Sequence, residues 1–377
     1  MADAPAISYA PSEELDLIRS TARQFLEERV PMERVRELMM SDDGFDDGLW
    51  KEMAGMGWTG LAISEEHGGS GLGYVEMTAL LEEMGTMVTP GPFFASAVVA
   101  TSAIQECATA EQGAGLLPSL ASGEAIATLA VFENARRWTP EGPSTTATSD
   151  DGGWVIDGSK RAVLAGERAD LLLVTAATDD GLGLFVVDPS SEGVVVTGEP
   201  ALDPTRRQAS VTFESVRVPQ PGRLGGGDVT AALRRVLALA TTALAAEQVG
   251  GAQRCMEMSV EYAKTRFQFG RPIGSYQSIK HRCANMLMKV EHARSCAYHA
   301  ARVTDDADEL AVAAPLAGSI ASEAYVWVAG ENIQVHGGIG FTWEHDAHIY
   351  LKRAKASSLL FGDPGHHRLM LGEALGI

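Results

Sequence analysis

Hydrophobic and polar positions at the start of the chain follow the spacing of α-helices. Apolar side chains recur every three or four residues from Leu17 through Ala22 to Phe25. The same spacing returns over residues 75–87. The first 118 residues are therefore expected to be helical.

A glycine-rich stretch interrupts this pattern. Residues 65–73, EEHGGSGLG, hold four glycines, so the backbone is expected to turn with angles that other residues avoid. The stretch superficially resembles the dinucleotide fingerprint G-x-G-x-x-G. However, Tyr74 breaks that pattern and no predicted strand precedes it. A Rossmann nucleotide site is therefore excluded here.

From about residue 125 to 218 the hydrophobic period changes to the alternation of β-strands. Turn residues such as those at 150–153 separate short runs rich in β-branched and aromatic side chains. The runs are 126–131, 154–156, 171–174, 184–187, 193–196 and 210–213. Regular spacing of this kind predicts a small antiparallel barrel or sandwich.

Helical spacing resumes near residue 229 and continues towards the end of the chain. Three long helices are predicted, Ala231–Arg266, Ile279–Arg302 and Leu310–Ile333. The whole order predicts an α+β multi-domain protein. Its parts are an N-terminal α-helical domain (1–118), a central antiparallel β-barrel (119–222) and a C-terminal helical bundle (223–377).

Composition narrows the classes of function. The 377 residues carry 30 basic and 50 acidic side chains, a formal net charge of −20. Nucleic-acid binding needs a clustered basic face, whereas here no run of lysine and arginine exceeds two residues. The charge pattern therefore argues against a nucleic-acid partner. Four widely spaced cysteines argue against disulfides and structural zinc and favour a cytoplasmic protein. The N-terminal residues do not resemble a signal peptide, and no apolar run reaches membrane-spanning length.

Two stretches in the C-terminal half suit the binding of a diphosphate. Arg266 ends a predicted helix and opens the loop FQFGRPI, where its guanidinium can hold two phosphate oxygens. Gly337 and Gly338, within QVHGGIGF, allow backbone N–H groups to approach an anion closely. Each stretch also has a plainer interpretation: a basic residue that complements a helix dipole, and an ordinary glycine turn.

Together and in this order, the stretches resemble signatures of the acyl-CoA dehydrogenase family. R-x-x-F-G-x-P-I begins at Arg266, Q-x-x-G-G-x-G at Gln334, and E-x-x-G-G-x-G at Glu65. The resemblance covers nearly the whole chain and implies that family's helical, antiparallel β-barrel and four-helix-bundle domains. It also implies FAD, an acyl-CoA thioester desaturated between its α and β carbons, and an electron-transfer flavoprotein as acceptor. Family members are dimers or tetramers with each FAD across a subunit interface.

The resemblance assigns the pyrophosphate and adenosine half of an FAD to both signatures. The residues are Arg266, Gln268, Phe269, Gln277, Gln334, Gly337 and Gly338. In the family this half of the site serves a flavin seated in a neighbouring subunit. No metal site is expected, because His345 and His348 lack the i, i+4 spacing of zinc helices. The histidines near the C-terminus are interpreted as a solvated or interface cluster.

The usual base of the family is missing from its expected position. Desaturation needs a base to remove the α-proton, and Gly362 stands where the family's Y-E-G-T segment has its glutamate. The alternative family position, on the first long C-terminal helix, falls on Ala240. Two turns further along lies Glu247, on the same helix face and among apolar neighbours, which makes it the candidate base. It could instead reach solvent or pair with a buried arginine, and Asp363 is a weaker rival.

The flavin-side segments of the β domain also depart from the family. Residues 131–140, VFENARRWTP, replace T-E-P-x-A-G-S-D, and residues 162–164, AVL, replace W-I-T/S. The chain thus keeps the adenosine half of the site and has lost much of the isoalloxazine half. These losses resemble actinobacterial acyl-CoA dehydrogenases that form α2β2 heterotetramers, including those of steroid side-chain degradation.

The leading prediction is a flavin-dependent acyl-CoA dehydrogenase that acts with a related subunit or as a homo-oligomer with an atypical flavin loop. The lost flavin-side tryptophan and the shifted base position predict a bulky or polycyclic acyl group. Two alternatives stay open. One is a non-catalytic subunit that completes the FAD site of a catalytic partner, and the other is a relative that oxidises nitroalkanes or amines.

Overall fold

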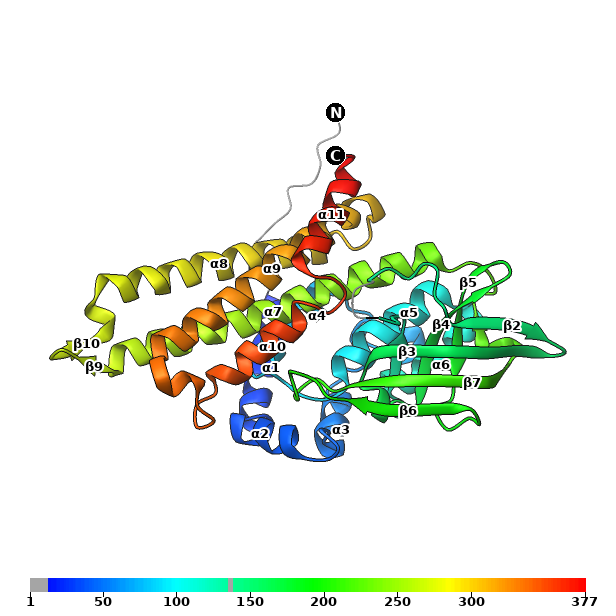
Figure 1. The fold of residues 1–377 in the computed structure, drawn as a ribbon, viewed down its shortest axis with the longest axis horizontal. Coiled ribbons are helices and arrows are strands. Elements are labelled where there is room, and N and C mark those ends of the chain that lie inside the picture. The colour runs from blue at the N-terminus through cyan, green and yellow to red at the C-terminus, as the bar shows by residue number, and fades with distance from the viewer. Residues whose placement is uncertain (1–12, 135–137) are drawn as a thin grey trace.

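The computed structural model describes residues 13–134 and 138–377, and its elements follow the predicted order of helices, strands and helices (Figure 1). The N-terminal helices are α1 Glu13–Arg29, α2 Met32–Met40, α3 Asp47–Gly55, α4 Tyr74–Thr86, α5 Thr101–Cys107 and α6 Ala110–Ala121. A π-helical segment, Phe94–Ala100, leads into α5. Between α3 and α4 the glycine-rich stretch forms the predicted turn, with φ of 81° at Gly68 and 64° at Gly71.

The strands of the middle region form an eight-stranded sheet within the described residues. They are β1 Ala127–Ala130, β2 Thr146–Asp150, β3 Gly153–Leu164, β4 Leu171–Thr178, β5 Gly181–Val187, β6 Val194–Glu199, β7 Gln208–Pro219 and β8 Arg223–Leu224. Their order is β6-β7-β3-β2-β4-β5-β8, with β1 beside β4. Pairing is antiparallel except where β4 meets β1 and, at one residue pair, β2. The module buries its own core, which includes Ile156, Phe185 and Phe213.

The C-terminal region is helical, as predicted. Its helices are α7 Thr230–Thr265, α8 Gln277–Arg302, α9 Ala307–His336, α10 Ala347–Ser357 and α11 Pro364–Leu375. The first three confirm the three predicted helices, with ends shifted by a few residues. A hairpin of β9 Phe267–Gln268 and β10 Arg271–Pro272 joins α7 to α8 at one tip of the molecule (Figure 1). The domain limits at 118 and 222 remain predictions.

Helices α4 and α7 cross with their backbones in contact. A Cβ atom on Gly85 of α4 would overlap the carbonyl oxygen of Glu247 on α7, and one on Gly250 would overlap that of Glu82. Only glycine permits such a close approach. This crossing ties the N-terminal helices to the C-terminal ones and sets the position of Glu247.

The stretch of α9 and the turn after it, residues 307–341, is long and apolar enough to cross a membrane by length and composition. It holds no uninterrupted apolar run of that length, because Glu323 divides the helix. In the fold, α9 packs at the centre of the C-terminal helices, and 61% of its apolar window is buried inside the molecule. These are the properties of a core helix, so the stretch is weak evidence for a membrane span.

A buried histidine makes the stability of this region depend on pH. His367 on α11 lies against Gly318 of α9, and burial lowers its pKa from 6.5 to about 4. The unfolded chain therefore takes up a proton at mildly acidic pH that the folded chain does not, so the free energy of unfolding falls as the pH drops below 6.5. Between pH 7 and 5 the loss from this one residue is expected to be about 2 kcal/mol.

Urea unfolding at the two pH values, followed by circular dichroism, measures this loss. In His367→Gln the difference between pH 7 and 5 should shrink by the same amount, because glutamine does not titrate. An unchanged difference in that variant would assign the acid sensitivity to other groups.

Candidate functional site

A cavity of about 610 Å³, here called the hairpin cavity, opens where α7, the β9–β10 hairpin, α8 and the end of α9 meet. The lining residues are Tyr262, Arg266, Gln268, Phe269, Ile273, Tyr276, Ser278, Ile279, Val335, His336, Gly337 and Gly338. The two motifs singled out in the sequence, almost 70 residues apart, are thus brought together in one site. Their meeting depends on α8, which runs back antiparallel to α7, and on α9, which returns in the direction of α7, so that the ends of α7 and α9 lie together.

Most of the predicted cofactor residues line this cavity. Arg266, Gln268, Phe269, Gly337 and Gly338 do so. The two predicted glutamines, at 277 and 334, are exposed and adjoin lining residues in the chain without lining the cavity themselves.

The donors of the hairpin cavity differ in one respect from the prediction. Arg266 follows α7 with an extended backbone, and within residues 13–134 and 138–377 its guanidinium makes no ion pair. Gly337 adopts a φ of 66°, and its N–H donates to the carbonyl of Ile333 to close α9. This N–H is therefore not available to an anion, and the role of Gly337 is the turn itself. A Cβ on Gly337 or Gly338 would meet open space, so a ligand has room to approach the backbone.

An aromatic wall completes the cavity, and the sequence reasoning missed it. The ring of Tyr262 packs against that of His336 with centres 4.4 Å apart and planes tilted by 31°, and the ring of His345 packs against His336 at 4.2 Å with planes tilted by 49°. Burial lowers the pKa of His336, which favours the neutral imidazole between these two rings. Tyr276 donates to the carbonyl of Gln268 at 3.1 Å and thereby braces the hairpin. The signal for His336 was its place inside QVHGGIGF, whereas Tyr262, Tyr276 and His345 lie outside the quoted stretches.

The cavity fits the diphosphate-containing half of FAD on the chemistry of its donors. A guanidinium that no carboxylate of the described residues pairs with, an open glycine turn and a wall of aromatic rings suit a diphosphate joined to an aromatic base. The hydrophobic residues around its mouth, Phe267, Phe269, Ile339 and Phe341, are exposed. They are available for contact with another chain.

Glu247 lies elsewhere, in a buried charge cluster with Asp203, Arg206 and Arg353. All four side chains are buried: the exposed fraction is 7% for Glu247, 1% for Asp203, 8% for Arg206 and 3% for Arg353. Arg206 Nη2 bonds Oε2 of Glu247, and Arg353 Nη1 bonds Oε1 at 3.1 Å. Both carboxylate oxygens therefore accept from a guanidinium. The sequence had left open whether Glu247 reaches solvent or pairs with a buried arginine, and the structure shows the pairing.

Arg353 is the centre of this buried charge cluster. Its Nε lies 2.9 Å from Oδ2 of Asp203, and its Nη2 donates to the carbonyls of Val88 and Thr89 at 3.2 and 3.1 Å. The cluster joins α7, α10, the β6–β7 connection and the chain after α4. It contains two positive and two negative groups, so its buried charge is balanced.

The segments of the β domain that stand where the family has its flavin-side loops leave almost no empty space around them. A cavity of only about 10 Å³, here called the phenylalanine-lined cavity, remains beside Phe132, Ala162 and Phe361. This is roughly the space of one water molecule. The ring of Phe361 contacts those of Phe94 and Phe132, each at 6.2 Å between centres. The segment predicted to replace the flavin loop is described except for residues 135–137, which lie outside the described residues.

The neighbouring turn holds Gly362, which stands where the family signature has its glutamate. Gly362 has a φ of 138°, and a Cβ there would lie 2.6 Å from Cδ2 of His366 and 3.0 Å from Cε1 of His367. A glutamate side chain has no room at this position. The rival candidate Asp363 caps α11 by accepting from the N–H of His366 at 2.7 Å, which gives it a structural role.

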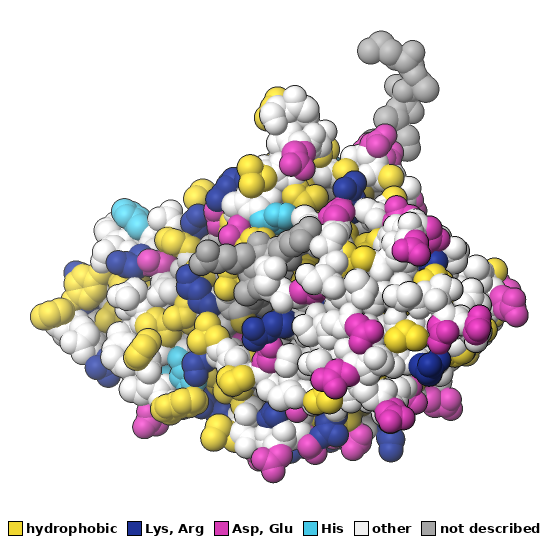
Figure 2. Space-filling view, turned by 45° about the vertical axis from the view of Figure 1, so that its right-hand side comes forward, with side chains coloured by type: hydrophobic (Ala, Val, Ile, Leu, Met, Phe, Trp, Pro, Cys, Tyr) yellow, Lys and Arg dark blue, Asp and Glu magenta, His cyan; other side chains and the backbone are white. Residues whose placement is uncertain are grey.

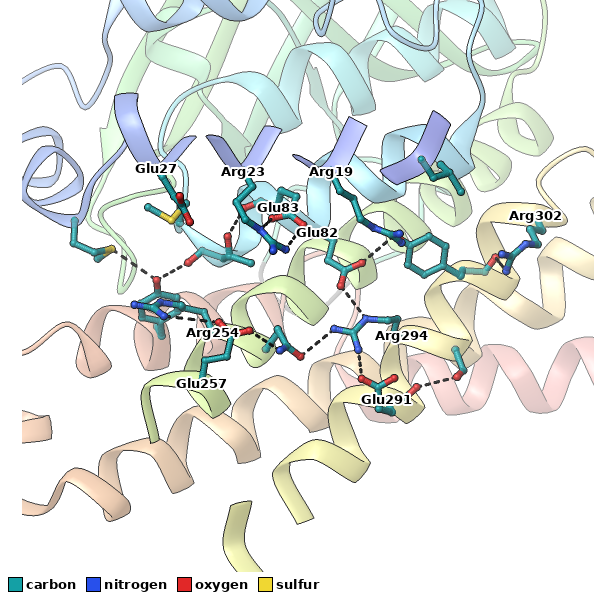
Figure 3. A pocket seen from close by; sticks show the side chains of 18 residues that line it. Arg19, Arg23, Glu27, Glu82, Glu83, Arg254, Glu257, Glu291, Arg294 and Arg302 are labelled. Carbon is teal, nitrogen blue, oxygen red and sulfur yellow. Dashed lines mark hydrogen bonds and ion pairs between the residues drawn. The ribbon is translucent and has the colours of Figure 1, made fainter. Parts of the chain in front are cut away.

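A larger cavity, of about 790 Å³, lies between α1, α4, α7 and α8 (Figure 3). Five arginines and five glutamates line it, and none of the predicted site residues does. Many of these charges pair across it: Arg23 bonds Glu83 and Arg294 bonds Glu82, both at 2.8 Å. Because its charges balance, the cavity does not select an anion or a cation. Among the described residues no group of histidines, cysteines and carboxylates could hold a metal ion.

Comparison with protein families matches three parts of the chain to three domains of one family. The N-terminal domain of acyl-CoA dehydrogenases matches residues 12–124, the middle domain residues 129–216 and the C-terminal domain residues 229–376. The hairpin cavity lies wholly within the C-terminal match. The buried charge cluster takes its four charged residues from the middle and C-terminal matches, and Arg353 also contacts the N-terminal match through the carbonyls of Val88 and Thr89.

Individual relatives agree with this match over their full length. The acyl-CoA dehydrogenase IpdE2 of Mycobacterium tuberculosis is 34% identical over 360 residues, which cover 94% of this chain and 95% of that protein. A variant of the Tcur3481-Tcur3483 steroid ACAD has a TM-score of 0.88 at 34% identity and covers 97% of this chain and 98% of its own. The ChsE4-ChsE5 complex from Mycobacterium tuberculosis has a TM-score of 0.90 at 29% identity, with 98% and 99% covered. The chain therefore belongs to the acyl-CoA dehydrogenase family of FAD-dependent oxidoreductases.

Proposed function

We propose that this chain works as one subunit of a hetero-oligomeric acyl-CoA dehydrogenase, within a tetramer that shares FAD between unlike chains. The observation that carries the proposal is the contrast between its two half-sites. The hairpin cavity offers about 610 Å³ and an Arg266 that makes no ion pair among the described residues, whereas the phenylalanine-lined cavity offers about 10 Å³. The adenosine half of an FAD fits the first, and its isoalloxazine half is then seated in a related chain.

In this assembly Arg266 binds the diphosphate, and the packed rings of Tyr262 and His336 form the wall beside it. FAD, when bound, accepts the hydride that leaves the β carbon of the acyl-CoA. We propose a bulky, steroid-derived acyl group, because similar proteins of known structure include a steroid ACAD. An electron-transfer flavoprotein is the proposed acceptor. The cytoplasm is the proposed location, supported by four free cysteines.

The flavin content of the chain purified alone tests this proposal. Absorbance of the denatured protein gives the ratio of FAD to chain, and light scattering gives the mass in solution. Little FAD alone, restored to a stoichiometric amount by co-expression with a related acyl-CoA dehydrogenase chain, is the expected result. About one FAD per chain in a homo-oligomer would contradict the sharing of FAD with an unlike chain.

Glu247 remains the proposed base for the alternative assembly, a homo-oligomer with an atypical flavin loop in which this chain also seats the flavin ring. The support for this role is that Glu247 is a buried carboxylate on α7, one helix turn from the crossing at Gly250. Glu247→Gln keeps the shape and hydrogen-bonding capacity of the side chain and removes the basic oxygen. Turnover in the assembled enzyme is expected to fall at least about 100-fold.

Glu323→Gln provides the matched control, because Glu323 is half-exposed on α9 and pairs with Arg368 at the surface. Its turnover should stay at the wild-type value. If Glu247→Gln behaves like this control, another group removes the α-proton.

A further inference from the structure

The end of α9 is an unfavourable place for an anion unless a positive charge is added there. The C-terminal end of a helix carries the negative end of its dipole, and α9 ends at His336, which lines the hairpin cavity. The N–H of Gly337 donates to the carbonyl of Ile333 and so does not face an anion. A diphosphate in the cavity therefore needs more positive charge than the glycine turn supplies.

The balance of charge shows which residues can supply it. The diphosphate of FAD is doubly negative at neutral pH. Among the described residues that line the cavity, Arg266 is the one with a permanent positive charge, and His336 is the only other one that can become positive near neutral pH. Arg266 balances one negative charge, and a proton on His336 would balance the second.

The hydrogen bonds of His336 determine which nitrogen receives this proton. Its Nδ1 lies 2.8 Å from the carbonyl oxygen of Asn332. A carbonyl can only accept, so Nδ1 carries the hydrogen of the neutral ring and Nε2 holds the lone pair. Nε2 makes no hydrogen bond within residues 13–134 and 138–377. Protonation turns Nε2 from an acceptor into a donor without disturbing the bond to Asn332.

The groups that line the cavity around His336 do not hold a proton on it in the absence of a ligand. Tyr262 on α7 packs against its ring at 4.4 Å between centres, and Tyr276, next to α8, and Arg266 line the same cavity. No carboxylate is among the described lining residues. Burial lowers the pKa of His336. The cavity without a ligand therefore favours the neutral ring, and a diphosphate would favour the protonated one.

His345, the second imidazole beside the cavity, is committed to another bond. Its ring centre lies 4.2 Å from that of His336, but its Nδ1 accepts from the N–H of Ala347 at 3.1 Å. The ring does not line the cavity. The carboxylate that follows it, Asp346, pairs with Arg36 at 2.6 Å. A proton that accompanies a ligand into the cavity therefore belongs on His336 and not on His345.

We infer that Nε2 of His336 is a further diphosphate-binding donor of the hairpin cavity, and that the chain takes up a proton there when FAD binds. The proton comes from solvent and forms an N–H bond with the lone pair of Nε2, and it returns to solvent when FAD leaves. Because His336 holds the proton more tightly in the complex, the affinity for FAD rises as the pH falls. This inference rests on the proposed function, in which the cavity holds the adenosine half of FAD.

Calorimetry measures this proton uptake directly. The apo-assembly is titrated with FAD at pH 7 in two buffers of different ionisation enthalpy, and the difference in heat gives the number of protons taken up. About half a proton per FAD is expected for wild type. The dissociation constant of FAD should be about 10-fold lower at pH 6 than at pH 8. FAD itself does not titrate between these pH values.

Three variants separate His336 from the other groups of the assembly. His336→Phe keeps a ring between Tyr262 and His345 but cannot take a proton, so it should bind FAD without uptake and with nearly the same affinity at pH 6 and 8. His336→Gln replaces it as the test if the phenylalanine variant does not fold. His345→Asn should keep the uptake. His292→Gln, the matched control at an exposed position on α8, should behave like wild type.

The inference is overturned if the wild-type assembly binds FAD without taking up a proton, or if His336→Phe keeps the uptake. Loss of the uptake in His345→Asn alone would also overturn it, because the proton then goes to His345. Failure of the proposed function gives a different result. In that case FAD does not bind to an assembly that contains this chain, or Arg266→Met binds it as tightly as wild type, and the inference falls with the proposed function.

Discussion

Replacing Arg353 with methionine is expected to lower the free energy of unfolding by about 3 to 5 kcal/mol. The change leaves Asp203 and Glu247, two buried carboxylates, with only Arg206 as a positive partner. It also removes the donors to the carbonyls of Val88 and Thr89. A buried charge without a partner costs far more than the pair contributed, because water cannot replace the missing guanidinium.

Urea unfolding of the purified protein measures this effect. Arg368→Met is the matched control, since Arg368 pairs with Glu323 and both side chains are more than half exposed. Its cost should stay below about 1 kcal/mol, as is usual for surface ion pairs. Equal costs for the two variants would show that the buried charge cluster does not hold the three regions of the chain together.

Replacing Arg266 with methionine should weaken FAD binding by about 10- to 100-fold. A hydrogen bond to a charged phosphate contributes about 1.5 to 3 kcal/mol, and each 1.4 kcal/mol is a factor of ten. Arg266 makes no ion pair within residues 13–134 and 138–377, so its loss leaves no unpaired carboxylate behind. The fold should therefore keep its stability while the affinity drops.

Fluorescence titration of the apo-assembly with FAD measures the affinity. Lys264→Met removes the same charge two residues earlier, at an exposed position outside the hairpin cavity, and should bind FAD within about two-fold of wild type on the same scale. If both variants weaken binding equally, the hairpin cavity attracts FAD only through its general positive charge. If neither does, the diphosphate lies elsewhere.

Much of the hairpin cavity could be predicted because its residues are close in sequence. Arg266, Gln268 and Phe269 follow one helix end, and the turn that begins at Gly337 follows another. Such local patterns reveal helix ends and turns directly. The pattern could not show that the N–H of Gly337 is used to close α9, nor that the rings of Tyr262 and His336 pack together, because both depend on how the helix ends meet. The exposed Gln277 and Gln334 were placed by resemblance.

The environment of Glu247 shows the opposite case. Its helix, its burial and its apolar neighbours follow from the periodicity of α7. Its partners do not, since Arg206 lies 41 residues away and Arg353 lies 106 residues away in the chain. No local pattern connects residues at such distances.

The sequence alone determined the order of helices, strands and helices, the family signatures and the absence of a glutamate at Gly362. These are properties of spacing and residue type, which local chemistry dictates. The tertiary structure decided which charges meet in the buried cluster, and it closed the flavin side with Phe94, Phe132 and Phe361. The physical reason is that burial and charge pairing arise only when distant segments pack together, and their energies depend on the exclusion of water from that contact.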